Sequence, residues 1–528
     1  MLTLIAVIAF LVAKTKRELL ILQQNSYFPN RYAQWIQRNV EKYLPRTAIV
    51  AFAASLLVYF DYTIIGKMIF AAVCAISAYW VWTQKEKKAL AFTPRVNRLF
   101  AASVVLAVLP IGVLYFILSY FFAPCAWFWT AVAVYAACAF PTVPYLANVL
   151  MQPYEAAVNQ GFIDDAAQKL KTHTQLTVIG ITGSYGKTST KHFVARILSE
   201  KFNVLMTPGS VNTTLGIVRI VREQLKPTHQ IFICEMGAKK RGDVKEICDL
   251  VQPDIGILTA VGPEHLDFFG NMDNVQKGNF ELIDSLDAAD GVAIMNSDYE
   301  LVANAPHPLA VQQKLYYSVE KGSKARFLAQ NITYTEQGMR FEVFDNDVFV
   351  LALDTKLLGI HNVSNILAGV IIALRLNMEH ARIAYAVRNL QPVKHRLEVK
   401  KHANGVTIID DSYNSNPKGA EMALQVLQQM RGTRKTIVTP GMIELGDEEF
   451  ALNKAFGKQI AAYTDYAVLV GPKQTVPIQE GLREANYPTE KIYIAKNLQD
   501  AMQHLNGRML AGDVILYEND LPDTYNEQ

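Results

Sequence analysis

This sequence has few cysteines, no dense basic tract and a small net charge, and each of these features excludes a class of protein. Five cysteines occur in 528 residues, without a CxxC pair or the Cys/His spacing of a zinc site. We therefore expect reduced, buried thiols and neither a zinc site nor a disulfide framework. The net charge is +3 and no dense basic tract occurs, which argues against a nucleic-acid partner.

Charge is also scarce within five apolar runs near the N-terminus. These runs are Leu2–Ala13, Ala48–Phe60, Tyr62–Trp82, Leu99–Phe122 and Ala126–Val149. The last three are long enough to cross a hydrocarbon core of about 30 Å as helices. The first has no basic residue ahead of it and no small-residue cleavage site, so we expect an anchor and not a removable signal peptide. The pattern predicts a transmembrane region of about five helices at residues 1–150.

Lysine and arginine concentrate in the connections after the first and third runs. Because positive connections stay on the cytoplasmic side, we expect a multi-pass membrane protein with its later domains in the cytoplasm and membrane lipid as a partner. In the first connection, Tyr32, Trp35, Ile36 and Val40 share one helical face. That face suits either a helix at the membrane interface or a helix packed on the domains that follow.

A glycine-containing turn then separates a predicted strand from a predicted helix. The sequence is Leu176-Thr-Val-Ile-Gly-Ile-Thr-Gly183-Ser184-Tyr185-Gly186-Lys187-Thr188-Ser189. Such a turn directs backbone amides and a helix N-terminus toward one point, which favours phosphate binding. Lys187 can reach the β- and γ-phosphates, and the Thr188 hydroxyl can ligate magnesium. An ordinary glycine turn is the alternative, because Ile181 stands where the longer phosphate-loop pattern has glycine.

Glu235 and His265 each follow an apolar run with the pattern of a buried strand. Open α/β sheets bind ligands at the carboxyl ends of their strands. A carboxylate at Glu235 can share magnesium with Thr188, since magnesium prefers a few protein oxygens together with phosphate oxygens. A surface glutamate and a structural histidine are the alternatives. We expect Glu264 and Asp267 to belong to a solvated turn.

Seven segments, taken in chain order, resemble those of the Mur ligases, with wording closest to the D-alanyl-D-alanine-adding type. They are Thr182–Thr188, Thr207–Gly216, Cys234–Gly242, Gly262–Gly270, His361–Asn365, Asp410–Pro417 and Gly441–Gly446. The resemblance implies an α/β fold with a P-loop-containing central domain at residues 151–390. It also implies a smaller, Rossmann-like C-terminal domain at residues 391–528. We expect the two domains to close around their ligands.

The resemblance also implies a reaction. ATP phosphorylates a substrate carboxylate, and an amine then attacks the acyl phosphate to form an amide bond. The expected cofactors are ATP and Mg²⁺, and the expected partners are a carboxylate of a cell-wall precursor or peptide and an amine donor. Peptidoglycan precursor synthesis is the first interpretation. The alternatives are a ligase for another polymer, such as poly-γ-glutamate, and a nucleotide-binding scaffold with a degenerate ligase site.

Site residues follow from the same resemblance. It implies catalytic roles for Lys187, Glu235, His265 and Arg396, and metal ligation by Thr188, Glu235 and His265. It assigns the nucleotide to Gly183, Ser184, Tyr185, Gly186, Lys187, Thr188, Ser189, Asn362, Asn365, Arg396 and Asp411. It assigns the substrate to Asn212, Thr213, Tyr413, Asn414 and Asn416. Without the resemblance, Asn362 and Asn365 would pass as helix caps and Arg396 and Asp411 as surface ion-pair residues.

The sequence departs from the family pattern in three places. Asn279 stands where the family usually has a carbamylated lysine that bridges magnesium, and Lys277 lies two residues earlier. The predicted membrane region occupies the place of the usual nucleotide-sugar-binding domain. The expected Lys-Gly-Ser segment near the C-terminus reads Glu518-Asn-Asp-Leu-Pro-Asp-Thr-Tyr525.

Overall fold

The computed structural model describes residues 2–25, 27–38, 64–83, 89–121, 142–335, 338–402, 404–413 and 415–520. The chain forms two compact units, Met1–Gly161 and Phe162–Gln528. In the described residues, the first unit consists of helices and connecting segments, and the second contains two β-sheets.

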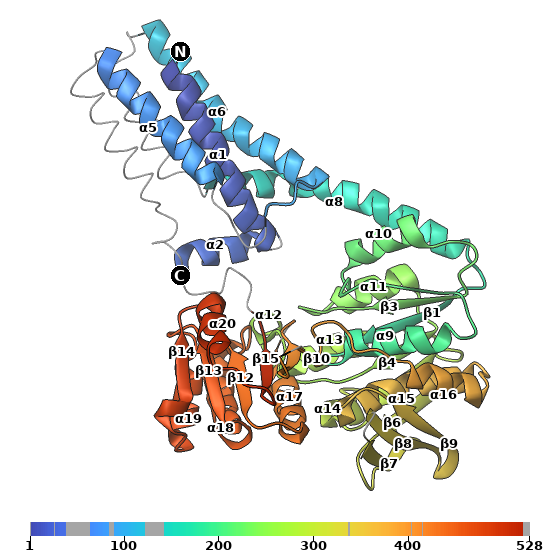
Figure 1. Ribbon diagram of the computed structural model, residues 1–528. Helices are drawn as coiled ribbons and strands as arrows, with labels where there is room; N and C mark the ends of the chain where they lie inside the picture. The colour runs from blue at the N-terminus through green and yellow to red at the C-terminus, as the bar shows by residue number, and fades with distance from the viewer. Residues whose placement is uncertain are drawn as a thin grey trace. The chain divides into compact units, whose positions relative to one another are not determined.

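Helices make up most of the described part of the first unit (Figure 1). They are α1 (Leu2–Gln24), α2 (Pro29–Arg38), α5 (Ile64–Thr83), α6 (Pro94–Phe121) and the start of α8 (Thr142–Lys171). Helix α1 packs against α5 and α6. Tyr32 of α2 is fully buried and donates a hydrogen bond to Glu18 of α1 at 3.0 Å. The face that Tyr32 shares with Trp35 and Ile36 therefore packs on other segments of its own unit.

The prediction of a transmembrane region at residues 1–150 is wrong. Within the described ranges, no helix is long and apolar enough to cross a membrane. Charged residues do fall inside two of these helices, since Lys14 and Glu18 are buried in α1 and Lys67 lies in α5. The membrane location, the cytoplasmic placement of the later domains and the membrane-lipid partner were inferred from that region and are withdrawn with it. The run Ala48–Phe60 and residues 122–141 lie outside the described residues.

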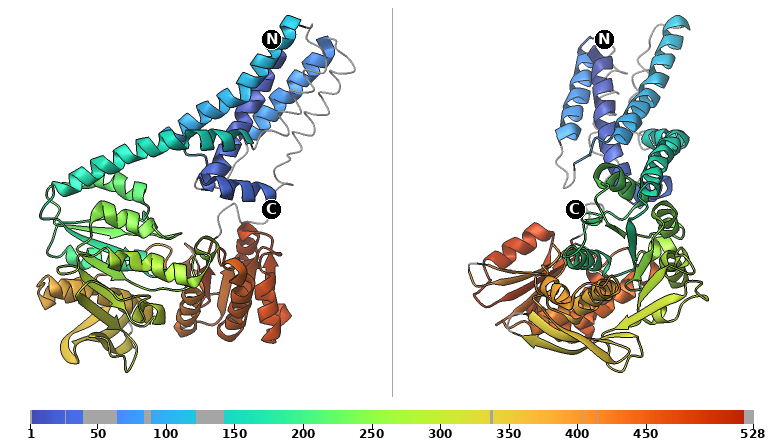
Figure 2. Two further views of the ribbon diagram at one scale, coloured as in Figure 1. Left: turned by 180° about the vertical axis from the view of Figure 1, so that it is seen from behind. Right: turned by 90° about the vertical axis from the view of Figure 1, so that its right-hand side faces the viewer.

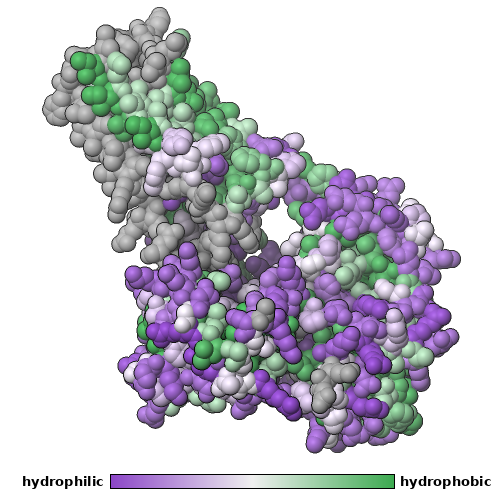
Figure 3. Space-filling model, viewed as in Figure 1, coloured by the Kyte–Doolittle hydropathy of each residue, from purple (hydrophilic) through white to green (hydrophobic). Residues whose placement is uncertain are grey.

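The visible surfaces of the two units differ in polarity. Apolar residues gather over the first unit, whereas hydrophilic residues dominate the second in the same view (Figure 3). Ile65, Met68 and Ile76 of α5 are among the exposed large apolar side chains.

Nine strands form the first sheet of the second unit, in the order β2-β3-β1-β4-β5-β6-β7-β8-β9. They are β1 (Thr177–Thr182), β2 (Val204–Met206), β3 (Ile231–Glu235), β4 (Ile255–Leu258), β5 (Val292–Asn296), β6 (Gln313–Ser318), β7 (Phe327–Thr335), β8 (Gly338–Asp345) and β9 (Val348–Thr355). The pairs from β2 across to β7 are parallel, and β7, β8 and β9 are antiparallel to one another. Every residue of β3 is buried, as expected for a parallel sheet that is covered on both faces.

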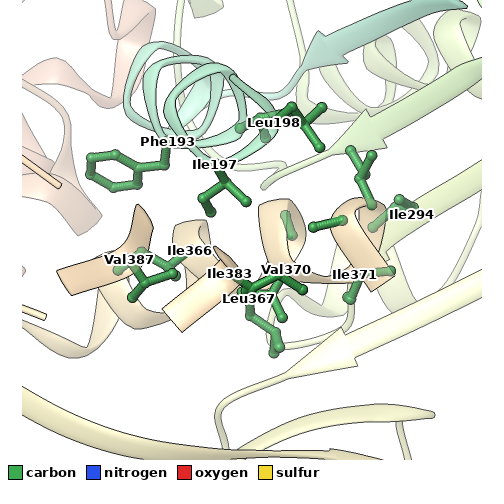
Figure 4. Close-up of a cluster of buried hydrophobic side chains, with 14 of the residues drawn as sticks. Phe193, Ile197, Leu198, Ile294, Ile366, Leu367, Val370, Ile371, Ile383 and Val387 are labelled. Carbon is green, nitrogen blue, oxygen red and sulfur yellow. The ribbon is translucent and has the colours of Figure 1, made fainter. Parts of the chain in front are cut away.

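Helices cover both faces of this sheet (Figure 1, Figure 2). They are α9 (Lys187–Leu198), α10 (Thr214–Gln224), α11 (Asp243–Val251), α12 (Leu266–Phe269), α13 (Met272–Asp284), α14 (Glu300–Ala303), α15 (Ile360–Arg375) and α16 (His380–Arg388). Two apolar clusters separate the layers. In one of them, Phe193 and Ile197 of α9 face Ile366, Leu367 and Val370 of α15 (Figure 4). Because α9 begins at the candidate phosphate loop, this packing fixes the direction of its N-terminus.

The second sheet has six strands in the order β10-β11-β15-β12-β13-β14. They are β10 (Glu398–Lys401), β11 (Thr407–Asp411), β12 (Lys435–Thr439), β13 (Tyr466–Val470), β14 (Ile492–Ala495) and β15 (Val514–Glu518). Only β10 runs antiparallel to its neighbour. Its main helices are α17 (Pro417–Gln429), α18 (Glu449–Tyr463), α19 (Val476–Glu484) and α20 (Leu498–Asn506). The mixed α/β architecture agrees with the sequence expectation, whereas the antiparallel β7–β9 extension was not predicted.

Candidate active site

The candidate phosphate loop lies where the strand order of the first sheet changes direction, so that the chain connections on its two sides lead away from each other. Strand β1 lies between β3 and β4, and the loop follows its carboxyl end. In open α/β sheets, ligands bind in the crevice at such a point. Strands β3 and β4 end at the same edge, where Glu235 is the last residue of β3 and His265 lies in the segment after β4.

Two glycines shape the turn between β1 and α9. Gly183 has a φ of 140° and Gly186 a φ of 80°, a region that favours glycine. A Cβ on Gly183 would collide with Thr259, and one on Gly186 would lie 2.8 Å from Asn365 Oδ1. Glycine is therefore required at both positions for conformation and for space.

The segment after β4 fixes the remainder of the turn. The Ser184 amide donates to the Ala260 carbonyl at 2.7 Å, and the Ser184 hydroxyl donates to the carbonyl and accepts from the amide of Gly262, at 3.0 Å each. The Tyr185 hydroxyl donates to the Pro263 carbonyl at 3.1 Å, and burial raises the pKa of Tyr185. The side chains of Ser184 and Tyr185, both predicted to contact nucleotide, thus hold the turn in shape.

Lys187 is folded back over its own loop. Its ammonium donates to the carbonyl of Gly183, to that of Ser184 at 3.2 Å, and to Glu264 Oε2 at 3.3 Å. The side chains of Lys187 and Glu264 are each only 15% exposed. Glu264 is therefore part of the site and not of a solvated turn, so that prediction is wrong. Its place directly before His265, after a buried strand, was the available signal.

Glu235 is the centre of the deepest polar cluster. Its side chain is 1% exposed; Oε1 accepts from Thr188 Oγ1 at 3.1 Å and from Asn212 Nδ2 at 3.2 Å. Oε2 accepts from Lys191 Nζ at 2.9 Å, and Lys191 also donates to the Gly209 carbonyl. Sequence reasoning missed Lys191, although it lies three positions after Thr188 on one helix face.

Two of the three predicted metal ligands meet in this cluster. Thr188 and Glu235 supply a hydroxyl and a carboxylate, which are the hard oxygen donors that magnesium prefers. Their chemistry fits magnesium held jointly with phosphate oxygens. His265 is placed differently: in the described part of the chain it forms no hydrogen bond or ion pair with Thr188 or Glu235.

His265 instead joins the two sheet-bearing parts of the second unit. Its Nδ1 lies 2.6 Å from Oε2 of Glu444, in the segment after β12, and its Nε2 lies 3.9 Å from Oε1 of Glu264. His265 has a φ of 52° and Glu444 a φ of 63°. Both residues therefore hold left-handed backbone conformations that cost energy outside glycine. Glu444 belongs to a motif that the sequence singled out without giving this residue a role.

Asn279, at the expected lysine position, and Lys277, two residues earlier, have different surroundings. Asn279 is buried; its Oδ1 accepts from Thr182 Oγ1 at 3.2 Å and its Nδ2 donates to the Val275 carbonyl at 2.9 Å. The Lys277 ammonium pairs with Asp273 at 2.7 Å, and both side chains are exposed. Asn279 thus lies directly behind β1, whereas Lys277 points to a surface partner.

A cavity of about 100 Å³ brings together predicted nucleotide-contacting residues from distant segments. Its lining includes Tyr185, Gly186, Ser189, Asn362, Asn365, Arg396 and Asp411. Asn365 accepts a hydrogen bond from Thr190 at 3.1 Å, and Asn362 donates to the Leu358 carbonyl at 2.8 Å. A cavity of about 780 Å³ shares Tyr185 and His361 with it and is also lined by α17 and α18.

Asp411 and Glu518 form a buried carboxyl pair beside Arg396. They are register neighbours on β11 and β15, and Ser415 donates to Glu518 Oε1 at 2.6 Å. Burial raises the pKa of Asp411 to about 6, against the opposing effect of Arg396. Burial, and then the Asp411 charge, raise the pKa of Glu518 well above its ordinary value. We therefore expect this pair to hold a proton, which would provide a donor beside Oε2 of Glu518, an atom without a hydrogen-bond partner among the described residues.

The predicted substrate residues are only partly gathered. Asn212 contacts Glu235, and exposed Thr213 stands at the N-terminus of α10. Tyr413 is 49% exposed, and the Arg396 guanidinium lies 4.4 Å from its ring centre. Asn416 lines the smaller cavity and caps α17 by accepting from the Gly419 amide at 2.8 Å. Asn414 lies outside the described residues.

One further cluster has metal-ligating side chains. His395, Glu398 and Asp410 place ligand atoms within 4.8 Å of one another. Lys400 already pairs with Asp410 at 2.8 Å and with Glu398 at 2.9 Å. The Lys400 ammonium already supplies the positive charge that a metal ion would bring to these carboxylates, so we interpret the cluster as an ion-pair network.

Two family comparisons cover most of the second unit. Residues 181–373 match the Mur ligase middle domain, and residues 395–517 match the Mur ligase, glutamate ligase domain. Two relatives are named UDP-N-acetylmuramoyl-tripeptide–D-alanyl-D-alanine ligase. The protein from Bacillus subtilis (strain 168) is 28% identical over 65% of this chain and 72% of its own length. That from Mycobacterium tuberculosis (strain ATCC 25618 / H37Rv) is 30% identical over 65% and 70%.

Solved structures agree with these matches. MurF from Acinetobacter baumannii superposes with a TM-score of 0.62 at 26% identity, over 70% of this chain and 78% of that one. MurF ligase from Thermotoga maritima in complex with ADP gives 0.59 at 24% identity, over 69% and 80%, and supports the fold alone.

Proposed function

The chain belongs to the Mur ligase family, and we propose from its site that it joins a precursor carboxylate to an amine at the expense of ATP. The prediction of an ATP-dependent, amide-forming ligase of peptidoglycan precursor synthesis is confirmed by the relatives of that class. The single observation that supports the residue assignment is the convergence of Gly186 and Ser189 with Arg396 and Asp411 around one cavity.

In the proposed mechanism, the protein holds the substrate carboxylate next to the phosphates of ATP, although these anions repel each other. The amide of Ser184 is used within the protein, so the amides at the N-terminus of α9 would face the phosphate tail, and Lys187 adds a positive charge. Arg396 approaches from the second sheet and can pair with phosphate oxygens in two parallel hydrogen bonds. Thr188 and Glu235 would hold Mg²⁺, which would offset phosphate charge and orient the transferring group.

The bonds change in two steps. A carboxylate oxygen attacks the γ-phosphorus, the bond to ADP breaks, and an acyl phosphate forms. The amine nitrogen then attacks the acyl carbon, loses its proton, and phosphate departs. Positioning and electrostatic stabilisation are the protein's contributions to both steps.

The named relatives suggest the finer substrate assignment. We propose that the acceptor is a muramoyl-tripeptide-type carboxylate and that the donor is a D-alanyl-D-alanine-type amine. We also propose that the ligase part divides into residues 151–390 and 391–528, and that Asn212, Thr213, Tyr413, Asn414 and Asn416 contact substrate. The names of the relatives favour peptidoglycan precursor synthesis over a poly-γ-glutamate type product. The intact contact between Thr188 and Glu235 argues against a scaffold with a degenerate ligase site.

The test uses the purified chain with ATP, Mg²⁺, UDP-N-acetylmuramoyl-tripeptide and D-alanyl-D-alanine. Phosphate release should require both the carboxylate and the amine. Lys187→Ala should lower the rate by about a thousandfold, because the cation that offsets phosphate charge is lost. Its melting temperature is measured alongside, since Lys187 also donates hydrogen bonds to Gly183, Ser184 and Glu264. ATP turnover that ignores both acceptors, or full activity in Lys187→Ala, would overturn the assignment.

A further inference from the structure

Lys191 is a buried cation for which the proposed mechanism has no role. It lies one turn after Thr188 in α9, and its side chain is 0% exposed. Its ammonium contacts Glu235 Oε2 at 2.9 Å and the carbonyl of Gly209. A lysine is buried this completely only with partners for its charge and its donors.

Lys191 leaves the two oxygens of Glu235 in different states. Oε2 is neutralised by the ammonium, whereas Oε1 faces Thr188 and Asn212, which are uncharged. The second lysine of this helix start, Lys187, is likewise paired with Glu264. Glu235 and Glu264 thus both have a lysine partner in the nucleotide-free protein. A divalent cation that arrives alone meets little net negative charge there.

Lys191 also connects two parts of the site. The same ammonium contacts the Gly209 carbonyl, and Asn212 of that segment donates to Glu235. The Asn212 carbonyl in turn accepts from the Gly237 amide at 2.8 Å, directly after β3. The metal carboxylate and the segment predicted to contact substrate therefore share one buried set of hydrogen bonds.

We propose that Lys191 is a positioning residue that neutralises Glu235 and so makes metal binding depend on the nucleotide. Phosphate oxygens then supply the negative charge and most of the ligands, while Glu235 and Thr188 hold one side of the ion. The proposal rests on the proposed function for the identity of the nucleotide. Its central claim, weak binding of metal alone, does not require turnover.

Mn²⁺ is a suitable probe because its free form gives a strong electron paramagnetic resonance signal. The full chain should bind Mn²⁺ weakly alone and at least tenfold more tightly with a non-hydrolysable ATP analogue. Lys191→Met should bind Mn²⁺ alone at least tenfold more tightly than the wild type, because Glu235 then keeps its full charge. An unchanged affinity for Mn²⁺ alone in a folded Lys191→Met protein would overturn the proposal.

Three variants keep the test decisive. Lys191→Gln retains a hydrogen-bond donor for the Gly209 carbonyl without the charge, and it should bind Mn²⁺ alone as tightly as Lys191→Met does. It replaces Lys191→Met if that variant does not fold. Lys191→Met combined with Glu235→Gln should lose the gain, since no carboxylate remains. Lys245→Met removes an exposed lysine that pairs with Asp249, and should leave Mn²⁺ binding unchanged. Equal tightening in Lys245→Met, or a retained gain in the double variant, would count against the proposal.

Metal binding and turnover can fail separately. If Mn²⁺ behaves as expected and no acceptor pair stimulates phosphate release, the proposed function is wrong and the role of Lys191 stands. If turnover is normal and Lys191→Gln binds Mn²⁺ as the wild type does, the role of Lys191 is wrong and the proposed function stands.

Discussion

Replacing Glu264 with glutamine should strengthen nucleotide binding. In the nucleotide-free protein, the Lys187 ammonium lies 3.3 Å from Glu264 Oε2, and both side chains are 15% exposed. Lys187 must leave this carboxylate to reach a phosphate, so the ion pair opposes binding. Glutamine keeps the size and a carbonyl oxygen but removes the charge. It also removes a negative charge that would repel the phosphates.

The magnitude follows from the same distance. Two unit charges 3.3 Å apart attract by about 5 kcal/mol at an effective dielectric constant of about 20. Desolvation offsets much of this, and a hydrogen bond to a charged group has a net contribution of about 1.5–3 kcal/mol. The carbonyl contacts of Lys187 remain in the variant. We therefore expect ADP to bind about tenfold more tightly, which corresponds to about 1.4 kcal/mol.

Isothermal titration with ADP measures this effect directly. The titration is run without divalent metal and at fixed ionic strength, so that only the protein charge changes. Asp267→Asn is the matched control, because Asp267 is an exposed carboxylate in the same turn and forms no ion pair with Lys187 in the described structure. Unchanged or weaker ADP binding in Glu264→Gln would refute the reasoning. Equal tightening in Asp267→Asn would show that general charge, and not the ion pair, is responsible.

Two further changes test the loop and the buried carboxyl pair. Gly183→Ala should reduce the free energy of unfolding by about 1–3 kcal/mol and weaken ADP binding, because the φ of 140° at Gly183 and the nearby Thr259 side chain leave no room for a Cβ. Denaturant melts and ADP titration measure the two effects. A variant of wild-type stability would contradict the prediction. The pKa of Asp411 in the folded protein is raised to about 6, so the folded protein binds more protons than the unfolded one between about pH 4 and pH 6. The contribution of the pair to stability therefore falls as pH rises through that window. Glu518→Gln removes the shared proton, so the stability difference between variant and wild type should move in the variant's favour from pH 4 to pH 6; a difference that does not vary with pH would count against a shared proton.

Local patterns in the sequence were sufficient to predict the strand–turn–helix that carries the candidate phosphate loop. The run of β-branched residues before Gly183 and the helical spacing after Thr188 lie within a single strand–turn–helix, so no distant partner was needed to read them. Glu235 was found for the same reason, since it ends a strand whose residues are all buried. The expected α/β architecture also came from such alternation of strand and helix patterns.

Residues whose role depends on a distant partner were not found. The contact between Glu264 and Lys187 spans 77 positions, and that between Lys191 and Glu235 spans 44. The local signals, a strand end before Glu264 and a helix face shared by Lys191 and Thr188, do not identify the partner of either charge. Arg396 and Asp411 were found only through the family resemblance, and the pairing of Asp411 with Glu518 required the sheet register.

The N-terminal prediction failed for a related reason. The apolar runs were judged by their own composition, whereas the structure buries polar groups in the segments that flank them. Glu18 accepts a hydrogen bond from Tyr32, and Arg98 forms two hydrogen bonds of 2.7 Å with Glu155. Such pairs need partners from separate helices, which a count of apolar residues does not register.

The position of β15 has a consequence for how the protein is made. This strand follows the other five strands of its sheet in the chain, yet it lies between β11 and β12. While a nascent chain is still shorter than Val514, those two strands have no neighbour on their facing edges, and exposed edges invite pairing with other chains. Asp411 would also lack its companion carboxyl until that moment. A translation product interrupted upstream of Val514 should therefore be an aggregation-prone fragment and not a weaker enzyme.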